Sequence, residues 1–186
     1  LSGMPFGDCP HLVLDIGGGS TELILADGRD ARALTSTRVG AVRLQRDFVR
    51  DDPMPPQRRT FLQAFIQGSL EPAVNKVLRR ITPEETPVMV ATSGTAMAIG
   101  ALAASEEDRP PLKLHGYRVS KQRLDRVVDR LVVMTPEQRK GLAPINGRRA
   151  EIIVPGALIL QTSMQMLRAK ELVLSERALR EGLIVD

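Results

Sequence analysis

Three consecutive glycines between two acids, with an apolar stretch on either side, constrain this chain more than any other feature. His11-Leu-Val-Leu14 leads into Asp15-Ile-Gly-Gly-Gly-Ser-Thr-Glu22, and Thr21–Ala26 is again mostly apolar. Glycines at a turn leave the backbone N–H groups uncovered, and successive N–H groups of this kind bind anions such as phosphate. The pattern therefore predicts a β-hairpin whose tip, Gly17–Gly19, is a concave anion site.

The residues beside the glycines supply further groups that suit a phosphate. Ser20 and Thr21 carry hydroxyl donors, while Asp15 and Glu22 are suited to hold a hard cation or a water molecule. The loop lacks the Gly-Lys-Ser/Thr ending of the Walker type, and no helix follows it as in the dinucleotide-binding fingerprint. The competing interpretation is a glycine-rich hairpin without a ligand, but three glycines are more than a tight turn needs.

Composition limits the class of protein. Apolar residues make up 42% of the 186 residues, and no run approaches the roughly 20 apolar residues of a membrane span, so we expect no membrane contact. The chain begins without a charged-then-apolar leader, and we expect a cytoplasmic protein. A single cysteine excludes an internal disulfide, and with two histidines a zinc site is not expected. A metal would therefore be bound by oxygen, for which magnesium is the natural candidate.

The charge balance favours an anionic partner. The formal net charge is +4, from 26 Lys and Arg against 22 Asp and Glu. Aromatic residues are only 3% and tryptophan is absent, so the stacking platform of single-stranded nucleic-acid binders is missing. We therefore expect no nucleic acid, and a small or polymeric phosphate is favoured.

Hydrophobic periodicity and turn residues predict an α/β fold with a mixed sheet. The expected strands are Leu12–Ile16, Thr21–Ala26, Ala33–Val39, Pro87–Thr92, Leu112–Val119 and Glu171–Leu174, with Asp27-Gly-Arg-Asp30 as a turn. The expected helices are Ala41–Val49, Gln57–Arg80, Ala96–Ala104, Ser120–Val133, one starting at Thr135, Arg148–Leu167 and Arg177–Val185. Pro72 predicts a kink or a break in the second of these helices.

Three other segments have the character of ligand contacts. Thr92-Ser-Gly-Thr95 lies at a strand-to-helix junction, where a helix N-terminus favours an anion; the competing interpretation is an ordinary helix cap. Val39-Gly-Ala-Val-Arg43 places an arginine near the glycine turn, although a solvated helix arginine is commoner. Ser175–Gly182 carries two arginines three residues apart, which also suits a surface helix with internal ion pairs. Arg148 and Arg149 are further candidates to guide a polyanion.

Taken in this order, these segments resemble the exopolyphosphatase and guanosine pentaphosphate phosphatase family. The matching runs are LVLDIGGGSTELILADG, TRVGAVRL, VATSGTAMAIGALA, LHGYRVS, RRAEIIVPGALIL and LSERALREGLIVD. The resemblance implies the actin-like ATPase fold, in which two ribonuclease-H-like lobes close on a phosphate. It implies that residues 1–186 are a single lobe, a mixed sheet with helices on both faces. That lobe would be the second domain, with the first lobe and the C-terminal domains absent from this chain.

The resemblance also implies an activity, which is hydrolysis of terminal phosphoanhydride bonds of polyphosphate or guanosine pentaphosphate with Mg²⁺. The presumed catalytic base belongs to the missing first lobe, so we expect at most trace activity from the isolated chain. Glu22 and Asp15 are the expected catalytic and metal-binding residues, and a homodimer is one expected assembly. The expected phosphate-binding residues are Gly17, Gly18, Gly19, Ser20, Thr21, Arg43, Ser93, Gly94 and Thr95. Glu151 and Glu176 stand where aspartate is common in the family.

Two alternatives come from other functional classes. One is the ATP-binding lobe of a kinase-like or chaperone-like protein, which requires an adenosine pocket near Ser93–Thr95. The other is a non-enzymatic module that binds phosphorylated nucleotides or polyphosphate and passes that state to a partner. Hydrolysis of ATP would favour the first, and a chain that is naturally complete would favour the second.

Overall fold

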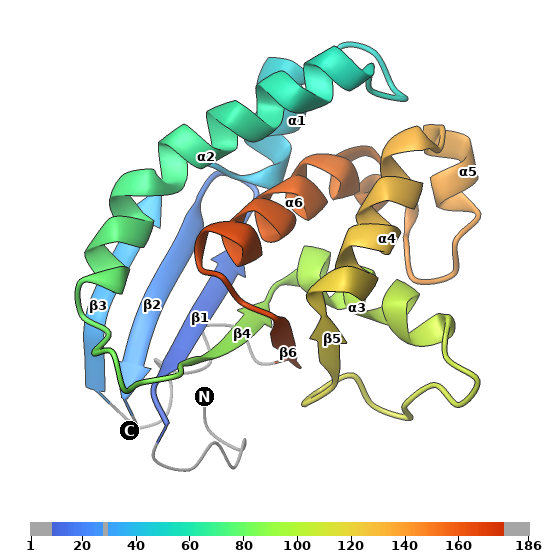
Figure 1. Ribbon diagram of the computed structural model, residues 1–186. Helices are drawn as coiled ribbons and strands as arrows, with labels where there is room; N and C mark the ends of the chain where they lie inside the picture. Colours follow the sequence, from blue (N-terminus) through green and yellow to red (C-terminus); the bar gives the residue numbers. More distant parts are fainter. Residues whose placement is uncertain (1–8, 28–29, 177–186) are drawn as a thin grey trace.

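The computed structural model describes residues 9–27 and 30–176, which form a six-stranded sheet with helices packed against it (Figure 1). The strands are β1 (His11–Ile16), β2 (Thr21–Asp27), β3 (Asp30–Thr37), β4 (Val88–Thr92), β5 (Arg118–Ser120) and β6 (Glu171–Ser175). The helices are α1 (Ala41–Phe48), α2 (Pro56–Leu78), α3 (Gly94–Ser105), α4 (Lys121–Val133), α5 (Pro136–Lys140) and α6 (Gly147–Met166). None of the helices described here has the length and hydropathy of a membrane span.

The sheet is mixed, as the sequence predicts. Its strand order is β3-β2-β1-β4-β6-β5. β1, β2 and β3 form an antiparallel meander, β1, β4 and β6 run parallel, and β5 is antiparallel to β6. The parallel pairs need crossover connections, which α1 and α2 provide before β4 and α3 to α6 provide before β6.

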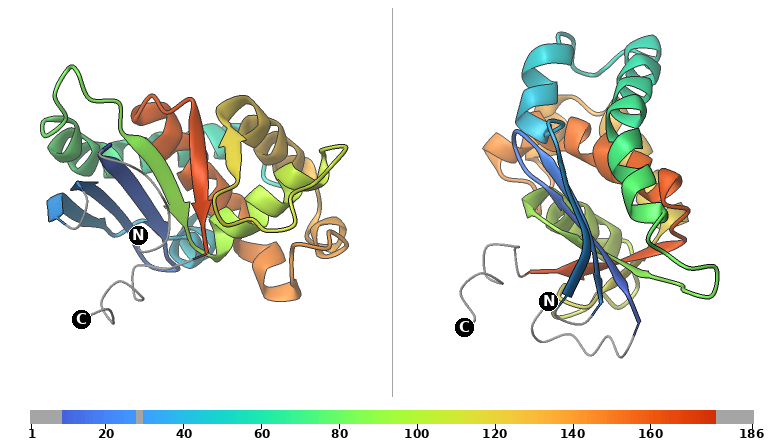
Figure 2. Two further views of the ribbon diagram at one scale, coloured as in Figure 1. Left: turned by 90° about the horizontal axis from the view of Figure 1, so that it is seen from below. Right: turned by 90° about the vertical axis from the view of Figure 1, so that its left-hand side faces the viewer.

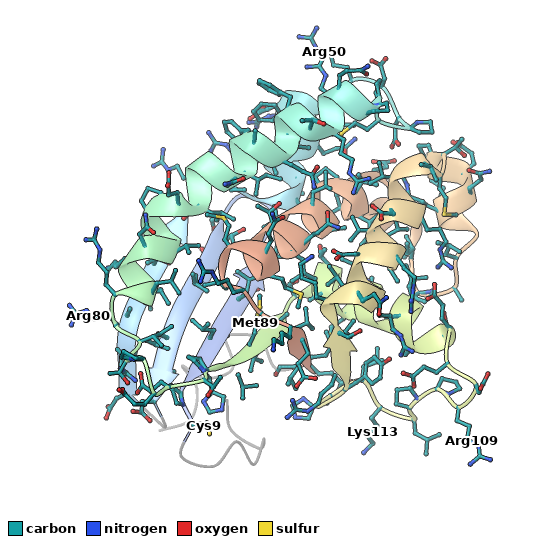
Figure 3. All side chains as sticks on the ribbon, in the orientation of Figure 1. Cys9, Arg50, Arg80, Met89, Arg109 and Lys113 are labelled. Atoms are coloured by element: carbon teal, nitrogen blue, oxygen red, sulfur yellow. The ribbon has the colours of Figure 1, made fainter. Side chains whose placement is uncertain are left out.

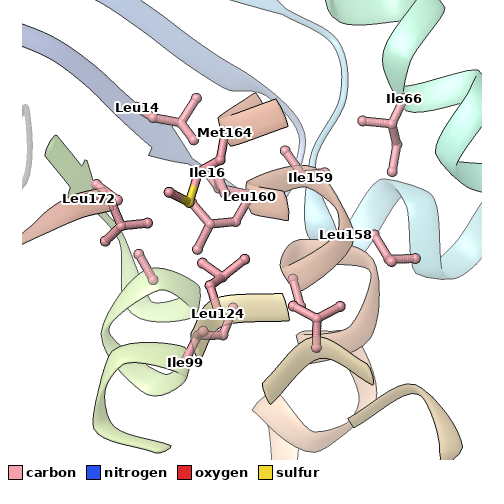
Figure 4. Close-up of a cluster of buried hydrophobic side chains, with 14 of the residues drawn as sticks. Leu14, Ile16, Ile66, Ile99, Leu124, Leu158, Ile159, Leu160, Met164 and Leu172 are labelled. Carbon is pink, nitrogen blue, oxygen red and sulfur yellow. The ribbon is translucent and has the colours of Figure 1, made fainter. Parts of the chain in front are cut away.

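The described helices pack on one face of this sheet. Leu14 of β1 shares one buried apolar cluster with Ile66 of α2, Ile99 of α3 and Leu158 of α6 (Figure 4). The alternate strand positions form a second, smaller cluster of strand residues, Val13, Ile24, Ala26 and Val90. Both crossovers move across the sheet in the same direction, so right-handed connections place their helices on the same side. In the side view of Figure 2, α2 accordingly lies along one side of the strands.

Most of the expected elements are confirmed with small shifts at their ends. Ser120 caps α4 by accepting from the N–H of Arg123, and Thr135 forms a capping box with Gln138. The expected closing helix Arg177–Val185 lies outside the described residues. Gly28 and Arg29 of the expected turn lie outside them as well.

Two elements differ from part of what the sequence predicts. The expected strand Leu112–Val119 is reduced to Arg118–Ser120, because Gly116 has φ +82° and the N–H of Tyr117 closes a turn onto the carbonyl of Leu114. Of the kink or break predicted at Pro72, the break does not occur, because α2 continues through this residue as one helix. Proline removes the N–H that would bond to the carbonyl of Gly68, but both residues are exposed, and water can satisfy that carbonyl.

Candidate active site

The glycine turn forms the tip of a β-hairpin, as the sequence predicts. Asp15 of β1 pairs with Glu22 of β2, and Ile16 pairs with Thr21. The N–H of Gly17 donates to the carbonyl of Ser20 at 2.8 Å, and this bond closes the turn. The expectation that all three glycine N–H groups face a ligand is therefore wrong for Gly17, whose N–H the turn itself uses.

Helix α1 fixes the direction of the remaining peptide groups. The N–H groups of Ala41 and Arg43, in its first turn, each donate at 3.0 Å to the carbonyls of Gly17 and Gly18. In a planar trans peptide the C=O and the N–H point in opposite directions. The N–H groups of Gly18 and Gly19 therefore point away from α1, on one side of the turn. In the part of the chain that the structure describes, no backbone carbonyl accepts from either.

The close approach of α1 to the turn requires a glycine at position 40. A Cβ built on Gly40 would lie 2.5 Å from the carbonyl carbon and oxygen of Gly18 and from the carbonyl carbon of Gly19. These are backbone atoms that cannot rotate aside. Gly19, in contrast, has no atom within 4 Å of a built Cβ, so its outer side is open.

A row of polar residues crosses the sheet beside this turn. In strand order, the register partners in the row are Ser36, Glu22, Asp15, Thr92 and Ser175. Because residues paired across neighbouring strands point to the same face, the whole row lies on the face opposite the described helices. Its centre is a pair of acids on neighbouring strands, an arrangement that is destabilising unless a cation or hydrogen-bond donors compensate it.

Two hydroxyl groups hold the carboxylate of Glu22. Ser20 Oγ and Ser36 Oγ both donate to Glu22 Oε1, each at 2.7 Å. The expected role of Ser20 as a phosphate donor therefore changes in this structure, because its proton is directed at Glu22. Ser36 was not among the residues expected at the site.

Thr21 has a structural role that differs from the expected one. Its side chain is buried, and its Oγ1 donates to the carbonyl of Val39 at 2.6 Å. In this structure the hydroxyl proton is therefore directed at the backbone and not at a phosphate site. The bond connects β2 to the segment that leads into α1, and so it helps to hold the glycine turn against that segment.

The junction between β4 and α3 forms a helix cap, the competing interpretation noted above. Ser93 has φ 138° and its Oγ accepts from the N–H of Ala96 at 3.1 Å. Thr95 is buried, and it packs so closely on α6 that a Cβ at Gly156 would lie 2.6 Å from its Cγ2. The two side chains are thus engaged within the protein. The unusual backbone of Ser93 is the kind of strain that often accompanies a functional site.

Two arginines lie close to these loops in different ways. Arg43 contacts the turn through its backbone, while its side chain pairs with Asp47, with 3.8 Å between Nε and Oδ2. The pKa of Asp47 is lowered, chiefly by the hydrogen bond from Arg46 and to a lesser extent by Arg43. Arg149 lies over the start of α3, where a Cβ at Gly94 would be 2.7 Å from its Nη2.

Other cations are spread around the molecule. Arg50, Arg80, Arg109 and Lys113 are exposed; Arg50 and Arg80 lie apart on the rim, and Arg109 and Lys113 lie in the one connection between α3 and β5 (Figure 3). They come from the ends of helices or from loops. Arg43 contacts the glycine turn through its backbone, and Arg149 lies over the β4–α3 junction, so both contribute positive charge close to these loops.

Comparison with known proteins identifies relatives along nearly the whole chain. The Ppx/GppA phosphatase family matches residues 1–186. "Exopolyphosphatase 2" of Mycobacterium tuberculosis is 33% identical over 181 residues, which are 95% of this chain and 55% of that protein. The "guanosine-5'-triphosphate,3'-diphosphate pyrophosphatase" of Vibrio parahaemolyticus is 28% identical over 180 residues, 97% of this chain and 34% of that protein.

Solved structures show the same fold. A Ppx/GppA family member from Aquifex aeolicus superposes with a TM-score of 0.83 at 24% identity, covering 96% of this chain and 56% of that one. An exopolyphosphatase from Cytophaga hutchinsonii superposes with a TM-score of 0.85 at 23% identity, covering 97% and 57%. The chain spans about half the length of the exopolyphosphatases it matches, 55% in the case above. The match over the full chain shows that it belongs to the Ppx/GppA phosphatase family.

Proposed function

We propose that this chain forms the second phosphate-binding lobe of a phosphohydrolase that releases orthophosphate from polyphosphate or guanosine pentaphosphate. One observation carries the proposal most directly. The first turn of α1 holds the carbonyls of Gly17 and Gly18, so the N–H groups of Gly18 and Gly19 face one way at the hairpin tip. Family membership and relatives named for exopolyphosphatase and for guanosine pentaphosphate hydrolysis support the substrate class.

In this proposal the terminal phosphate of the substrate lies against the N–H groups of Gly18 and Gly19. Backbone donors suit a phosphate because they are fixed before the substrate arrives. Arg149, over Gly94 at the start of α3, adds a cation whose planar guanidinium matches phosphate oxygens. Arg43 is the second candidate cation, and it must release Asp47 to reach a substrate.

Magnesium fits the residues present. Asp15 and Glu22 are register partners on neighbouring strands, so their carboxylates share one face beside the turn. In the described ranges, no three His, Cys, Asp or Glu side chains gather into a metal site. Mg²⁺ suits such a sparse set because it is commonly bound by one or two carboxylates, waters and substrate phosphates. A bound ion would neutralise charge on the phosphate and offset the repulsion between the two acids.

Glu22 is proposed to orient the attacking water. Phosphoryl transfer to water requires an in-line nucleophile and a group that accepts a hydrogen bond from it. Glu22 stands at the start of β2, one residue beyond Thr21, whose hydrogen bond to Val39 fixes this end of the strand. The acid is therefore part of a rigid support and not of a mobile loop.

The rest of the active site is proposed to come from another lobe. The chain spans 55% of its M. tuberculosis relative, and two facing lobes would enclose the phosphate between them. The 186-residue chain alone should then bind phosphate or pyrophosphate weakly and release orthophosphate at no more than a trace rate. The relatives carry the names of both substrates, so both remain candidates.

The test is steady-state phosphate release by the full-length protein that carries this chain, with polyphosphate, guanosine pentaphosphate and ATP as substrates. Glu22→Gln should lower kcat by roughly a hundredfold to ten-thousandfold with little change in KM, because it removes the charge but keeps the size. The matched control is Glu71→Gln, an exposed carboxylate on α2, which should behave as wild type.

Two results would contradict the proposal. Near-normal kcat in Glu22→Gln would remove Glu22 from the reaction. Hydrolysis of ATP with no phosphate release from polyphosphate or guanosine pentaphosphate would favour the kinase-like or chaperone-like alternative.

A further inference from the structure

We propose that Ser36 of β3 is a positioning residue that makes Glu22 act through a single oxygen, Oε2. The inference rests on the proposed function, since it assigns a role within the same site. It begins from the two 2.7 Å hydrogen bonds that Ser20 and Ser36 donate to Glu22 Oε1.

These two bonds fill the hydrogen-bonding capacity of one carboxylate oxygen. A carboxylate oxygen has two lone pairs, and each hydroxyl proton uses one of them. Among the described residues, no hydrogen bond or ion pair is made to Oε2. The two oxygens of Glu22 are therefore unequal: Oε1 is committed to the protein, and Oε2 is left to accept a proton or to coordinate a cation. Bidentate coordination of a metal by Glu22 would require one of the two serine bonds to break.

The two donors come from different elements, which is why they fix the orientation of the side chain. Ser20 belongs to the hairpin turn, and Ser36 to the neighbouring strand β3, directly opposite Glu22 in the register. A glutamate side chain loses substantial rotamer freedom when it is held in one place, and that cost falls on the free protein before the substrate binds. Preorganisation of this kind lowers the barrier to reaction without strengthening the binding of the substrate.

Ser36 contributes little to the stability of the fold. It is exposed, and its hydrogen bond to Glu22 is solvent-accessible. Thr35, the preceding residue, also donates a hydroxyl bond across to β2, but to the backbone carbonyl of Leu23 at 2.8 Å. Thr35 and Ser36 thus allow a matched comparison. Substitution of either residue removes one hydroxyl bond to β2, and only Ser36 bonds to Glu22.

The experiment compares Ser36→Ala, Ser36→Thr and Thr35→Val in the full-length protein by steady-state phosphate release and thermal unfolding. Ser36→Ala should lower kcat by roughly tenfold to a hundredfold, as expected for a slightly misplaced catalytic group, with KM within about twofold of wild type. Ser36→Thr keeps the hydroxyl and should restore most of the kcat. Thr35→Val should leave kcat near wild type, and the melting temperatures of Ser36→Ala and wild type should agree closely.

A double variant sharpens the test. Because Ser20 and Ser36 hold the same oxygen, each single change leaves one donor in place. Ser20→Ala with Ser36→Ala should therefore lower kcat by more than the product of the two single effects. Wild-type kcat in Ser36→Ala, or an equal loss in Thr35→Val, would overturn the proposal.

A spectroscopic measurement separates this proposal from the proposed function. The ¹³C resonance of the Glu22 carboxylate in the 186-residue chain should move in Ser36→Ala and stay in place in Thr35→Val. This holds whether or not the wild-type protein releases phosphate. An inactive wild type with a moved resonance would contradict the function alone, while an unmoved resonance in Ser36→Ala would overturn the role of Ser36.

Discussion

At the scale of the residue, Gly40 decides the direction of the anion site although it belongs to the segment before α1. Its missing Cβ lets the first turn of α1 reach the carbonyls of Gly17 and Gly18. Gly40→Ala should push the hairpin tip away, because the clash at 2.5 Å is with backbone atoms. We expect a destabilisation of about 1–3 kcal/mol, the usual cost of overpacking, and weaker binding of pyrophosphate.

The matched change is Gly19→Ala, where a Cβ meets no atom within 4 Å. It should leave the urea midpoint of unfolding close to that of wild type. If Gly40→Ala were as stable as Gly19→Ala, the contact between α1 and the turn would not be as tight as the structure has it.

A second residue, His11, should make the stability of the fold depend on pH. His11 is 3% exposed on β1, and burial lowers its pKa below the ordinary value of 6.5. The folded protein therefore favours the neutral imidazole. Above pH 6.5 His11 is neutral in both the folded and the unfolded protein, and it does not lower the free energy of unfolding. Below pH 6.5 the unfolded chain takes up the proton first, so the free energy of unfolding falls.

Protonation of His11 in the unfolded chain should lower the free energy of unfolding by at most about 1.4 kcal/mol per pH unit below pH 6.5. His11→Gln, which does not titrate, should show a smaller fall in the urea midpoint between pH 7.5 and pH 5.5. Identical pH dependence in both proteins would show that His11 protonates equally in the folded and unfolded states.

At the scale of the element, α1 is held in place from both ends. Its first turn binds the glycine turn, and the loop after it is tied to α5 by an ion pair between Asp52 and Arg139. Arg139 is fully buried, and its guanidinium also donates to the carbonyl of Leu131 at 3.3 Å. This pair supports the element that orients the anion site.

Breaking the pair from either side should have unequal effects. Asp52→Ala leaves a buried cation without its carboxylate and should cost about 3–5 kcal/mol, while Arg139→Met removes the charge itself and should cost less. Urea unfolding of both variants measures the difference. A larger loss in Arg139→Met would mean that packing of the arginine stem outweighs its charge.

The hairpin, the helix caps and the mixed sheet could be predicted from the sequence because each depends on local signals. The position of Ser36 beside Glu22 could not be predicted, because it depends on a register shift. Counted from the pair Asp27–Asp30, a regular ladder would place Thr35 opposite Glu22, but an irregularity between Leu25 and Ala26 brings Ser36 there instead. The hydrogen bond of Thr21 was not predicted for a related reason, since its partner, Val39, is distant in sequence.

At the scale of the whole molecule, the polar row lies toward the ends of the parallel strands β1 and β4, where open α/β sheets bind ligands. The described helices support this edge from one face, and the acids project from the other. The arrangement leaves the hairpin tip and the acid pair on the side where a second lobe would close over a phosphate. The proposed function divides the site between two lobes, and on that proposal the isolated chain should bind phosphate without efficient turnover.

The central claim is that the N–H groups of Gly18 and Gly19 bind phosphate, and one measurement tests it most directly. The 186-residue chain labelled with ¹⁵N is titrated with pyrophosphate in the presence and absence of Mg²⁺. The amide resonances of Gly18 and Gly19 should shift and saturate together, more strongly with Mg²⁺, while Gly17, whose N–H donates to Ser20, shifts less. Saturable binding that leaves Gly18 and Gly19 unmoved, or no binding with Mg²⁺ present, would contradict the account.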